Sequence, residues 1–341
     1  MEPPARATDV IAALERIGYL LDRAREKSYR VRAYQRAAEV IRDLPPGELD
    51  ERVSRGTLEE LDGIGPKTAA VIHEVATTGT AEYLAKLQEE TGVAAGAGNE
   101  LLAALKGDLH VHSTWSDGGA EIDVMARAAR DLGHEYIALT DHSPRLTIAH
   151  GLSRERLEEQ LVVVEALNAD LAPFRILTGI EVDILEDGSL DHTDEMLARL
   201  DVVVASVHSK LRMDGKEMTR RMITAIANPN VDILGHCTGR LVVGRGRPQS
   251  DFDAELVFHA CEQLGTAVEI NSRPERLDPP KDLLDIAVEM GCEFSIDTDA
   301  HAPGQLEWQP YGADKAADSG ITPDRIINTR GADGLLEWTR Q

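Results

Sequence analysis

The sequence contains little cysteine, few aromatic residues and no long apolar run, and each shortage narrows the class of protein. Its three cysteines, Cys237, Cys261 and Cys292, are odd in number and widely spaced, which argues against a disulfide framework and favours a reducing compartment. No stretch approaches the roughly twenty apolar residues that cross a bilayer, and the first ten residues lack the apolar segment of a signal peptide. We therefore expect a cytoplasmic protein with no membrane partner.

Positive charge is also scarce, because 36 Lys and Arg residues face 60 Asp and Glu residues and leave a formal net charge of −24. This balance argues against a broad nucleic-acid surface, since phosphate backbones are bound by Lys and Arg. The charge is uneven, however, and bound cations would neutralise some carboxylates. Residues 23–42 contain seven basic residues against Glu26 and Glu39. This segment can bind nucleic acid on an acidic protein, with a strong dependence on salt.

The first part of the chain has the pattern of a small helical domain. Apolar residues recur at helical spacing from about residue 8 to residue 88, as in Val10, Leu14 and Ile17. The run Gly63-Ile64-Gly65-Pro66-Lys67 indicates a tight turn followed by a new helix, whose first amides can hold a phosphate. We predict an all-α helix-hairpin-helix domain over residues 1–90 and a linker over residues 91–105, where small residues gather.

From residue 106 the pattern changes to short strands that alternate with amphipathic helices. Seven strands are predicted, at Asp108–His112, Tyr136–Asp141, Arg175–Val182, Val202–His208, Val231–Gly235, Ala267–Asn271 and Glu293–Asp297. Seven such repeats without long gaps predict an α/β fold over residues 106–341, a closed parallel barrel of the TIM type with one unit missing.

Histidines and carboxylates gather at or just after the ends of these strands. His110 and His112 are two residues apart on one strand and therefore share a face. Nine candidate metal ligands follow this pattern: His110, His112, Asp117, His142, Glu181, His208, His236, Asp299 and His301. The carboxyl ends of barrel strands meet at one mouth, so these side chains should converge. Nine ligands exceed the needs of one ion, so two or three divalent ions are expected; without thiolate ligands, Zn, Mn and Fe all remain possible.

The motifs around these residues resemble those of the PHP (polymerase and histidinol phosphatase) domain family. They are Gly107–Gly118, Thr140–Ser143, Gly179–Glu181, Ser206–Ser209, Gly235-His236 and Asp297–His301, and the resemblance covers roughly residues 106–335. It implies a distorted (β/α)7 barrel with three divalent ions that hydrolyses phosphoesters. The implied ligand sets are His110, His112, Glu181 and Asp299 for one ion, Glu181, His208 and His236 for a second, and Asp117, His142 and His301 for a third.

A metal-bound hydroxide would then be the nucleophile, because divalent ions lower the pKa of bound water. Arginines would hold the phosphate and stabilise the charge that develops on it. Arg240, Arg245 and Arg247 follow His236 and are the first candidates, and Arg273 and Arg276 come second. The expected catalytic set is His110, His112, Glu181, His208 and Asp299, with Arg240 and Arg245.

Residues 30–41 and 61–69 resemble the small amino-terminal domain of family-X DNA polymerases. The resemblance implies that Arg30, Tyr34 and Lys67 contact a DNA phosphate, together with the hairpin glycines Gly63 and Gly65. Val71 takes the place of the Schiff-base lysine of the lyase-active members, which argues against lyase activity. Residues 87–106 leave no room for a polymerase core, so polymerase activity is not expected.

We therefore expect a metal-dependent phosphoesterase in DNA repair, acting on gapped DNA or on DNA 3′ ends. The expected types are a 3′-5′ exonuclease, a 3′-phosphatase or an abasic-site endonuclease. A small-molecule phosphatase of the histidinol-phosphatase type is the first alternative, although such an enzyme does not need the basic segment. A non-catalytic DNA-binding protein is the second alternative, although the full ligand set weighs against it.

Overall fold

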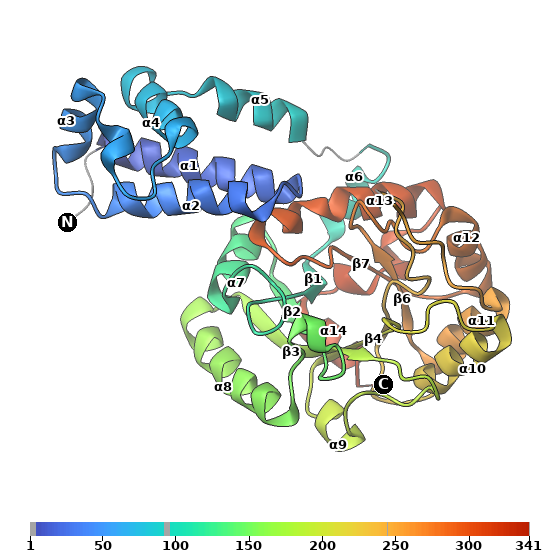
Figure 1. Cartoon of the computed structure of the whole chain (residues 1–341). Helices are drawn as coiled ribbons and strands as arrows, with labels where there is room; N and C mark the ends of the chain where they lie inside the picture. The colour runs from blue at the N-terminus through green and yellow to red at the C-terminus, as the bar shows by residue number, and fades with distance from the viewer. Residues whose placement is uncertain (1–4, 92–95, 244, 341) are drawn as a thin grey trace. The chain divides into compact units, whose positions relative to one another are not determined.

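A computed structural model describes residues 5–91, 96–243 and 245–340, which form two compact units, 1–92 and 93–341. The first unit is helical (Figure 1), with α1 (Ala5–Arg23), α2 (Ser28–Arg42), α3 (Glu48–Arg55), the 3-10 turn η1 (Leu58–Glu60), α4 (Pro66–Thr78) and α5 (Glu82–Thr91). Its core is aliphatic, and the side chains of Leu14, Ile17 and Ile72 are fully buried within it.

The turn before α4 depends on Gly63, whose φ is +93°. A Cβ atom at Gly63 would lie 3.0 Å from Cγ of Arg36, so both the backbone conformation and the available space favour glycine. Pro66 begins α4 at a position where the missing amide hydrogen costs no helical hydrogen bond. The predicted helix–turn–helix arrangement is therefore present around residues 58–78.

The second unit is built on one seven-stranded parallel sheet whose order follows the sequence, β1 to β7. The strands are β1 (Gly107–Val111), β2 (Tyr136–Leu139), β3 (Arg175–Asp183), β4 (Val202–Ser206), β5 (Ile233–Leu234), β6 (Ala267–Asn271) and β7 (Phe294–Asp297). A parallel bridge between Val111 and Ala300 joins the two ends of the sheet. The predicted (β/α)7 barrel is confirmed.

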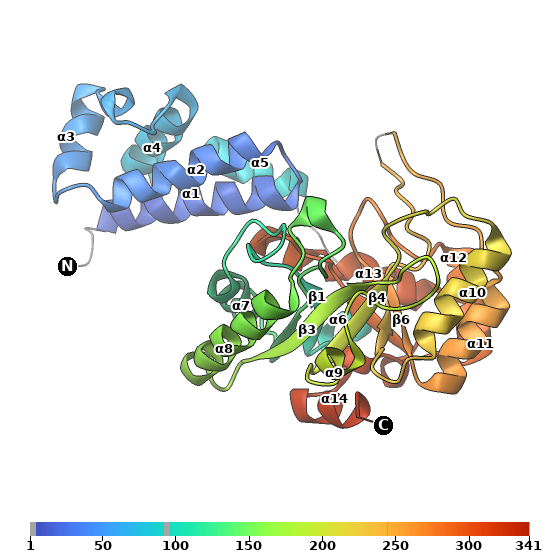
Figure 2. The ribbon, with the colours of Figure 1, turned by 60° about the horizontal axis from the view of Figure 1, so that its bottom comes forward.

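Helices surround the barrel, and α10, α11 and α12 lie side by side along one part of it (Figure 2). The helices are α6 (Asn99–Ala104), α7 (Ile122–Asp131), α8 (Arg154–Leu171), α9 (Asp194–Leu197), α10 (Gly215–Ile226), α11 (Ala254–Leu264), α12 (Lys281–Met290), α13 (Gln309–Asp318) and α14 (Ala332–Trp338). Short 3-10 turns are η2 (Thr147–Ala149), η3 (Pro303–Trp308), η4 (Pro323–Arg325) and η5 (Ile327–Thr329).

Most strand ends lie within two residues of the expectation, and the structure differs more clearly in two places. The stretch expected as a linker, 91–105, contains α6, and Leu101 on this helix is buried in the core of the second unit. Residues 92–95 of that stretch lie outside the described residues. The fifth strand is shorter than expected and comprises only Ile233–Leu234. The side chain of Asp232, just before it, accepts the Val203 amide, and Gly235 follows it directly. In the described part of the chain, no helix is long and apolar enough to cross a membrane.

Candidate metal centre

The nine predicted ligands come from both ends of the sheet and from its middle, and the structure brings them together. They fall into four overlapping groups in which ligand atoms lie within 4.8 Å of one another: His112, Asp117, His142 and His301; His110, Glu181 and His236; His110, His112 and Asp299; and His142, Glu181 and His208. The bridge between Val111 and Ala300 explains part of this convergence, because it sets the β1 histidines beside the residues that follow β7.

Glu181, near the end of β3, lies at the centre of the cluster and is 1% exposed. Its Oε1 lies 2.8 Å from Nε2 of His236 and 3.2 Å from Nε2 of His208. Its Oε2 lies 2.9 Å from Nδ1 of His142 and 3.3 Å from Nε2 of His110. A carboxylate whose two oxygens face different imidazoles has the geometry that a bridging metal ligand requires.

Asp117, in the loop after β1, marks the open side of the cluster. Its Oδ1 lies 3.3 Å from Nε2 of His301 and 3.4 Å from Nε2 of His142, and its side chain is 35% exposed. The other members are buried or nearly so, and Asp299 approaches His112 within 3.5 Å in the interior. Solvent and substrate therefore have access on the side of Asp117.

Several buried polar atoms of the cluster form no hydrogen bond of acceptable geometry with any described residue, although some lie close to one another: Nε2 of His110, both ring nitrogens of His112, Nδ1 of His142, Oε2 of Glu181, Nε2 of His208 and Nδ1 of His236. Buried polar groups nearly always have a hydrogen-bond partner, so a cluster of unpaired buried nitrogen and oxygen atoms indicates a binding site for a ligand. Imidazole and carboxylate donors without thiolate suit Zn, Mn or Fe. The residues present thus fit divalent metal ions.

Charge within the cluster shifts the pKa values of its members. Burial alone would lower the pKa of His110, but Glu269 and Glu181 raise it well above the ordinary value. For Glu181, burial opposes ionisation, yet the neighbouring imidazoles, His208 first, lower its pKa well below the ordinary value. Burial lowers the pKa of His112. Glu181 therefore stays ionised, and divalent ions would replace the proton that the raised pKa keeps on His110.

Two carboxylates that the sequence analysis did not single out contact the imidazole rings of predicted ligands. Asp183 makes a short hydrogen bond with Nδ1 of His208, and Oε1 of Glu269 lies 2.6 Å from Nδ1 of His110. Both could have been noticed in the sequence. Asp183 is two residues from Glu181 on the same strand face, and Glu269 is an acid between Val268 and Ile270 in a buried strand.

Two of the three arginines after His236 bind backbone carbonyls of nearby loop residues. The guanidinium of Arg240 donates from Nε to the Arg276 carbonyl, at 2.9 Å, and from Nη2 to the Leu277 carbonyl. Nε of Arg247 donates to the Gly239 carbonyl at 2.6 Å, whereas Arg245 is exposed. Arg240 and Arg247 thus hold loop backbone together, which short-range sequence reasoning could not show.

The second-ranked arginines are the ones that contact the cluster. Nη1 of Arg273 lies 3.1 Å from Oδ1 of Asp299 and 3.1 Å from Nδ1 of His301. Nε of Arg276 donates to Oδ2 of Asp299 at 3.0 Å, and its buried Nη1 has no partner among the described residues.

In the helical unit, Arg30, Tyr34, Lys67 and Val71 line a pocket of about 450 Å³, together with Ala70, Glu74, Glu82, Tyr83 and Lys86. Nη2 of Arg30 donates to the Tyr83 hydroxyl at 2.8 Å, and the rings of Tyr34 and Tyr83 stack with centroids 6.0 Å apart. Three of the predicted DNA contacts therefore share one cavity, whose lining combines three cations and two tyrosines with the carboxylates of Glu74 and Glu82.

The hairpin glycines lie beside this pocket in the chain and have different roles. The Gly65 amide donates to the Thr68 hydroxyl at 3.0 Å, so it is already used within the helix start. Gly63 provides the turn conformation described above. Neither residue lines the pocket.

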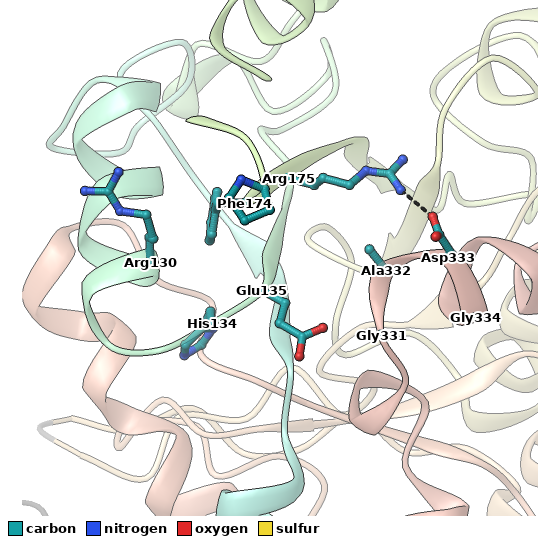
Figure 3. A pocket seen from close by; sticks show the side chains of 10 residues that line it. Arg130, His134, Glu135, Phe174, Arg175, Gly331, Ala332, Asp333 and Gly334 are labelled. Atoms are coloured by element: carbon teal, nitrogen blue, oxygen red, sulfur yellow. Dashed lines mark hydrogen bonds and ion pairs between the residues drawn. The ribbon is translucent and has the colours of Figure 1, made fainter. Parts of the chain in front are cut away.

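A cavity of about 600 Å³ lies at the amino-terminal ends of the barrel strands, away from the cluster; Figure 3 shows the side chains that line it. Its lining includes Glu135, which precedes β2, and Arg175, the first residue of β3. Arg175 is paired with Asp333 at 2.8 Å. None of the nine predicted ligands lines this cavity, so its size does not indicate the reactive site.

The chain is similar to known proteins in both units. Residues 6–81 match a helix-hairpin-helix domain family and residues 108–273 match the PHP domain family. The DNA polymerase/3′-5′ exonuclease PolX of Bacillus subtilis (strain 168) is 42% identical over 229 residues, which cover 67% of this chain and 40% of that protein. A probable phosphatase of Thermoanaerobacter sp. (strain X514) is 32% identical over 238 residues, which cover 65% of this chain and 89% of that protein.

One solved structure is similar at a low level. It is histidinol phosphate phosphatase from Lactococcus lactis subsp. lactis Il1403, complexed with zinc, L-histidinol and phosphate, with 21% identity and a TM-score of 0.49. The superposition covers 64% of this chain and 94% of that chain.

Proposed function

The chain belongs to the PHP family of phosphoesterases, and we propose that it hydrolyses phosphoesters at DNA ends or gaps in DNA repair. The observation that carries the DNA assignment is the pocket of Arg30, Tyr34 and Lys67 in the helical unit. Its cations suit a phosphate, and its stacked tyrosines suit a sugar or base. A phosphatase for a small metabolite has no use for such a second site.

The proposed centre holds three divalent ions of Zn, Mn or Fe, which when bound lower the pKa of water and polarise the phosphoryl group. We assign His110, His112, Asp299, His208 and His236 as terminal ligands and Glu181 as the shared one. Asp117, His142 and His301 form the third set, on the open side. Three of the groups support parts of this division: His110, His112 and Asp299 form one group, Asp117, His142 and His301 fall together in another, and Glu181 and His236 share a third. The distances from Glu181 to His208 and His236 support the set that these two histidines complete.

The arginine assignment changes with the structure. We propose that Arg273 and Arg276 hold the substrate phosphate, because both contact Asp299 and Arg276 has an unpaired buried nitrogen. Arg240 instead fixes the backbone that holds Arg276. Arg245 is exposed and free of this bracing role, so it stays a candidate contact for a longer substrate.

The proposed reaction releases a nucleotide or a phosphate from a DNA 3′ end, or cleaves at an abasic site, without polymerisation. The Bacillus subtilis relative is named as a 3′-5′ exonuclease, which supports the first of these. Val71, at the position where the resemblance places the Schiff-base lysine, lines the pocket and has no amine to form a Schiff base. A small-molecule phosphatase remains the second candidate, because the Thermoanaerobacter relative is named a probable phosphatase and is matched over 89% of its length.

The test compares the parental protein with His208→Ala on a 3′-hydroxyl oligonucleotide, a 3′-phosphorylated oligonucleotide and histidinol phosphate. We expect the parental protein to hydrolyse at least one oligonucleotide, and the variant to lose that activity while its gel shift with gapped DNA stays nearly unchanged. Hydrolysis of histidinol phosphate alone would favour the second candidate. Equal rates for the two proteins would contradict the metal assignment, and gapped-DNA binding without any hydrolysis would favour the non-catalytic alternative.

A further inference from the structure

Strand β6 contributes no member to the four groups of candidate ligands, although it lies between the strands that lead to His236 and Asp299. It nevertheless carries two polar side chains, Glu269 and Asn271, which are both 0% exposed. Residues two apart on a strand share a face, so both side chains point toward the same side as the cluster. A buried acid and a buried amide on a core strand need a structural or functional reason.

Glu269 uses both carboxylate oxygens on residues of the cluster. Its Oε1 lies 2.6 Å from Nδ1 of His110, and its Oε2 accepts the backbone amide hydrogen of His236. The hydrogen bond to Nδ1 fixes the proton of His110 on that nitrogen and leaves Nε2 as the ligand atom. Nε2 of His110 indeed faces Glu181, at 3.3 Å.

Asn271 extends the same network toward the end of β7. Its Nδ2 lies 3.3 Å from Oε2 of Glu269 and 3.3 Å from Oδ2 of Asp299. Its Oδ1 accepts the backbone amide hydrogen of Arg273 at 3.1 Å. One amide therefore links the Glu269 carboxylate, a candidate ligand and an arginine of the site.

We propose that Glu269 is a positioning residue that sets the tautomer of His110 and the backbone position of His236, and that Asn271 extends this control to Asp299. Strand β6 thus orients ligands that arise from β1, β5 and β7 without binding an ion itself. The inference rests on the proposed metal centre, because His110, His236 and Asp299 are the proposed metal ligands that these contacts orient.

Glu269→Gln tests the proposal with almost no change in shape. The carboxylate accepts at both oxygens, whereas the amide offers one oxygen and one NH2 group. The NH2 group would face either the Nδ1–H of His110 or the amide hydrogen of His236, so one of the two contacts becomes a repulsive donor–donor contact. Loss of such a supporting hydrogen bond costs about 10- to 100-fold in metal affinity.

The experiment measures Mn²⁺ binding by calorimetry for the parental chain, Glu269→Gln, Asn271→Ala and the matched control Asp232→Asn. Asp232 is also a largely buried carboxylate that accepts a backbone amide, from Val203 at 2.7 Å, but it precedes β5 at the other end of the barrel. We expect about 10- to 100-fold weaker binding at one site in Glu269→Gln, a smaller loss in Asn271→Ala, and parental binding in Asp232→Asn. Parental binding by both β6 variants would overturn the proposal.

A second readout separates this proposal from the proposed function. Nitrogen NMR of histidine-labelled protein should show His110 protonated at Nδ1 in the parental chain, and an altered Nδ1 signal in Glu269→Gln. An unchanged signal would overturn the positioning role even if metal binding falls. A parental protein that binds no Mn²⁺ but shows the Nδ1 change would refute the metal centre and retain the contact. Should Glu269→Gln fail to fold, Asn271→Ala decides the metal-affinity part.

Discussion

Arg221 on α10 provides a quantitative test of how the ligand-bearing strands are held. Its guanidinium is 1% exposed and donates to two backbone carbonyls. Nε lies 3.1 Å from the oxygen of Ile184, and Nη1 lies 2.9 Å from the oxygen of Ser209. Ile184 follows the end of β3 directly, and Ser209 follows His208. One side chain thus ties together the two segments that carry Glu181 and His208.

Arg221→Met fills similar space and removes these donors. The Ile184 carbonyl is left buried without a partner, which costs about 1–3 kcal/mol, and the charge-assisted bond to Ser209 contributes about 1.5–3 kcal/mol. The guanidinium no longer has to be desolvated, which offsets part of the loss. We therefore expect the free energy of unfolding of the barrel to fall by about 3 kcal/mol.

Urea unfolding followed by tryptophan fluorescence measures this change in the barrel alone. The three tryptophans of the chain, Trp115, Trp308 and Trp338, all lie in the second unit. Arg220→Met is the matched control, because Arg220 is the exposed neighbour on the same helix, and it should change stability by no more than about 0.5 kcal/mol. Equal losses in the two variants, or a loss under about 1 kcal/mol in Arg221→Met, would refute the bracing role.

Three further predictions concern DNA, pH and metal. Lys67→Ala should weaken gapped-DNA binding and reduce the slope of log affinity against log salt by about one, and an unchanged slope would count against a phosphate contact. Burial lowers the pKa of His134 to about 4. Below pH 6.5 the unfolded chain therefore binds more protons at this residue than the folded chain does, and the free energy of unfolding decreases as the pH is lowered. This should cost about 1.6 kcal/mol between pH 6.5 and 5 in urea titrations, and His134→Gln should remove that part of the loss. Chelation should lower the melting temperature of the barrel, and Mn²⁺ at about 100 times its Kd should restore about 2.7 kcal/mol; a melting temperature insensitive to both additions would contradict metal binding.

The sequence was sufficient to predict the barrel and the meeting of distant ligands. The reason is that parallel strands place their carboxyl ends at one mouth, so residues such as His110 and His301 converge whatever the loops do. The same argument cannot predict where the end of a long side chain lies when its residue is on a loop. Arg240 and Arg276 both follow strand ends, yet only Arg276 contacts the cluster, because the guanidinium of Arg240 binds loop carbonyls instead.

Contacts between distant strands also escaped the sequence analysis. Glu269 and His110 are 159 residues apart in the chain, and no local pattern predicts which ring nitrogen receives the carboxylate. The helix α6 was missed for a different reason. The small residues before it indicate a linker, whereas Leu101 gains its stability from burial against the barrel, a tertiary effect that outweighs local composition.

The most direct test of the metal centre is anomalous X-ray diffraction from crystals grown with Mn²⁺, recorded at the manganese edge. The account predicts separate anomalous peaks within the cluster, one of them between Glu181 and His208, and their partial or complete loss in Glu181→Gln crystals. Ordered side chains with no anomalous peak among them, or peaks confined to other surfaces of the barrel, would contradict the claim that these residues form a multinuclear centre.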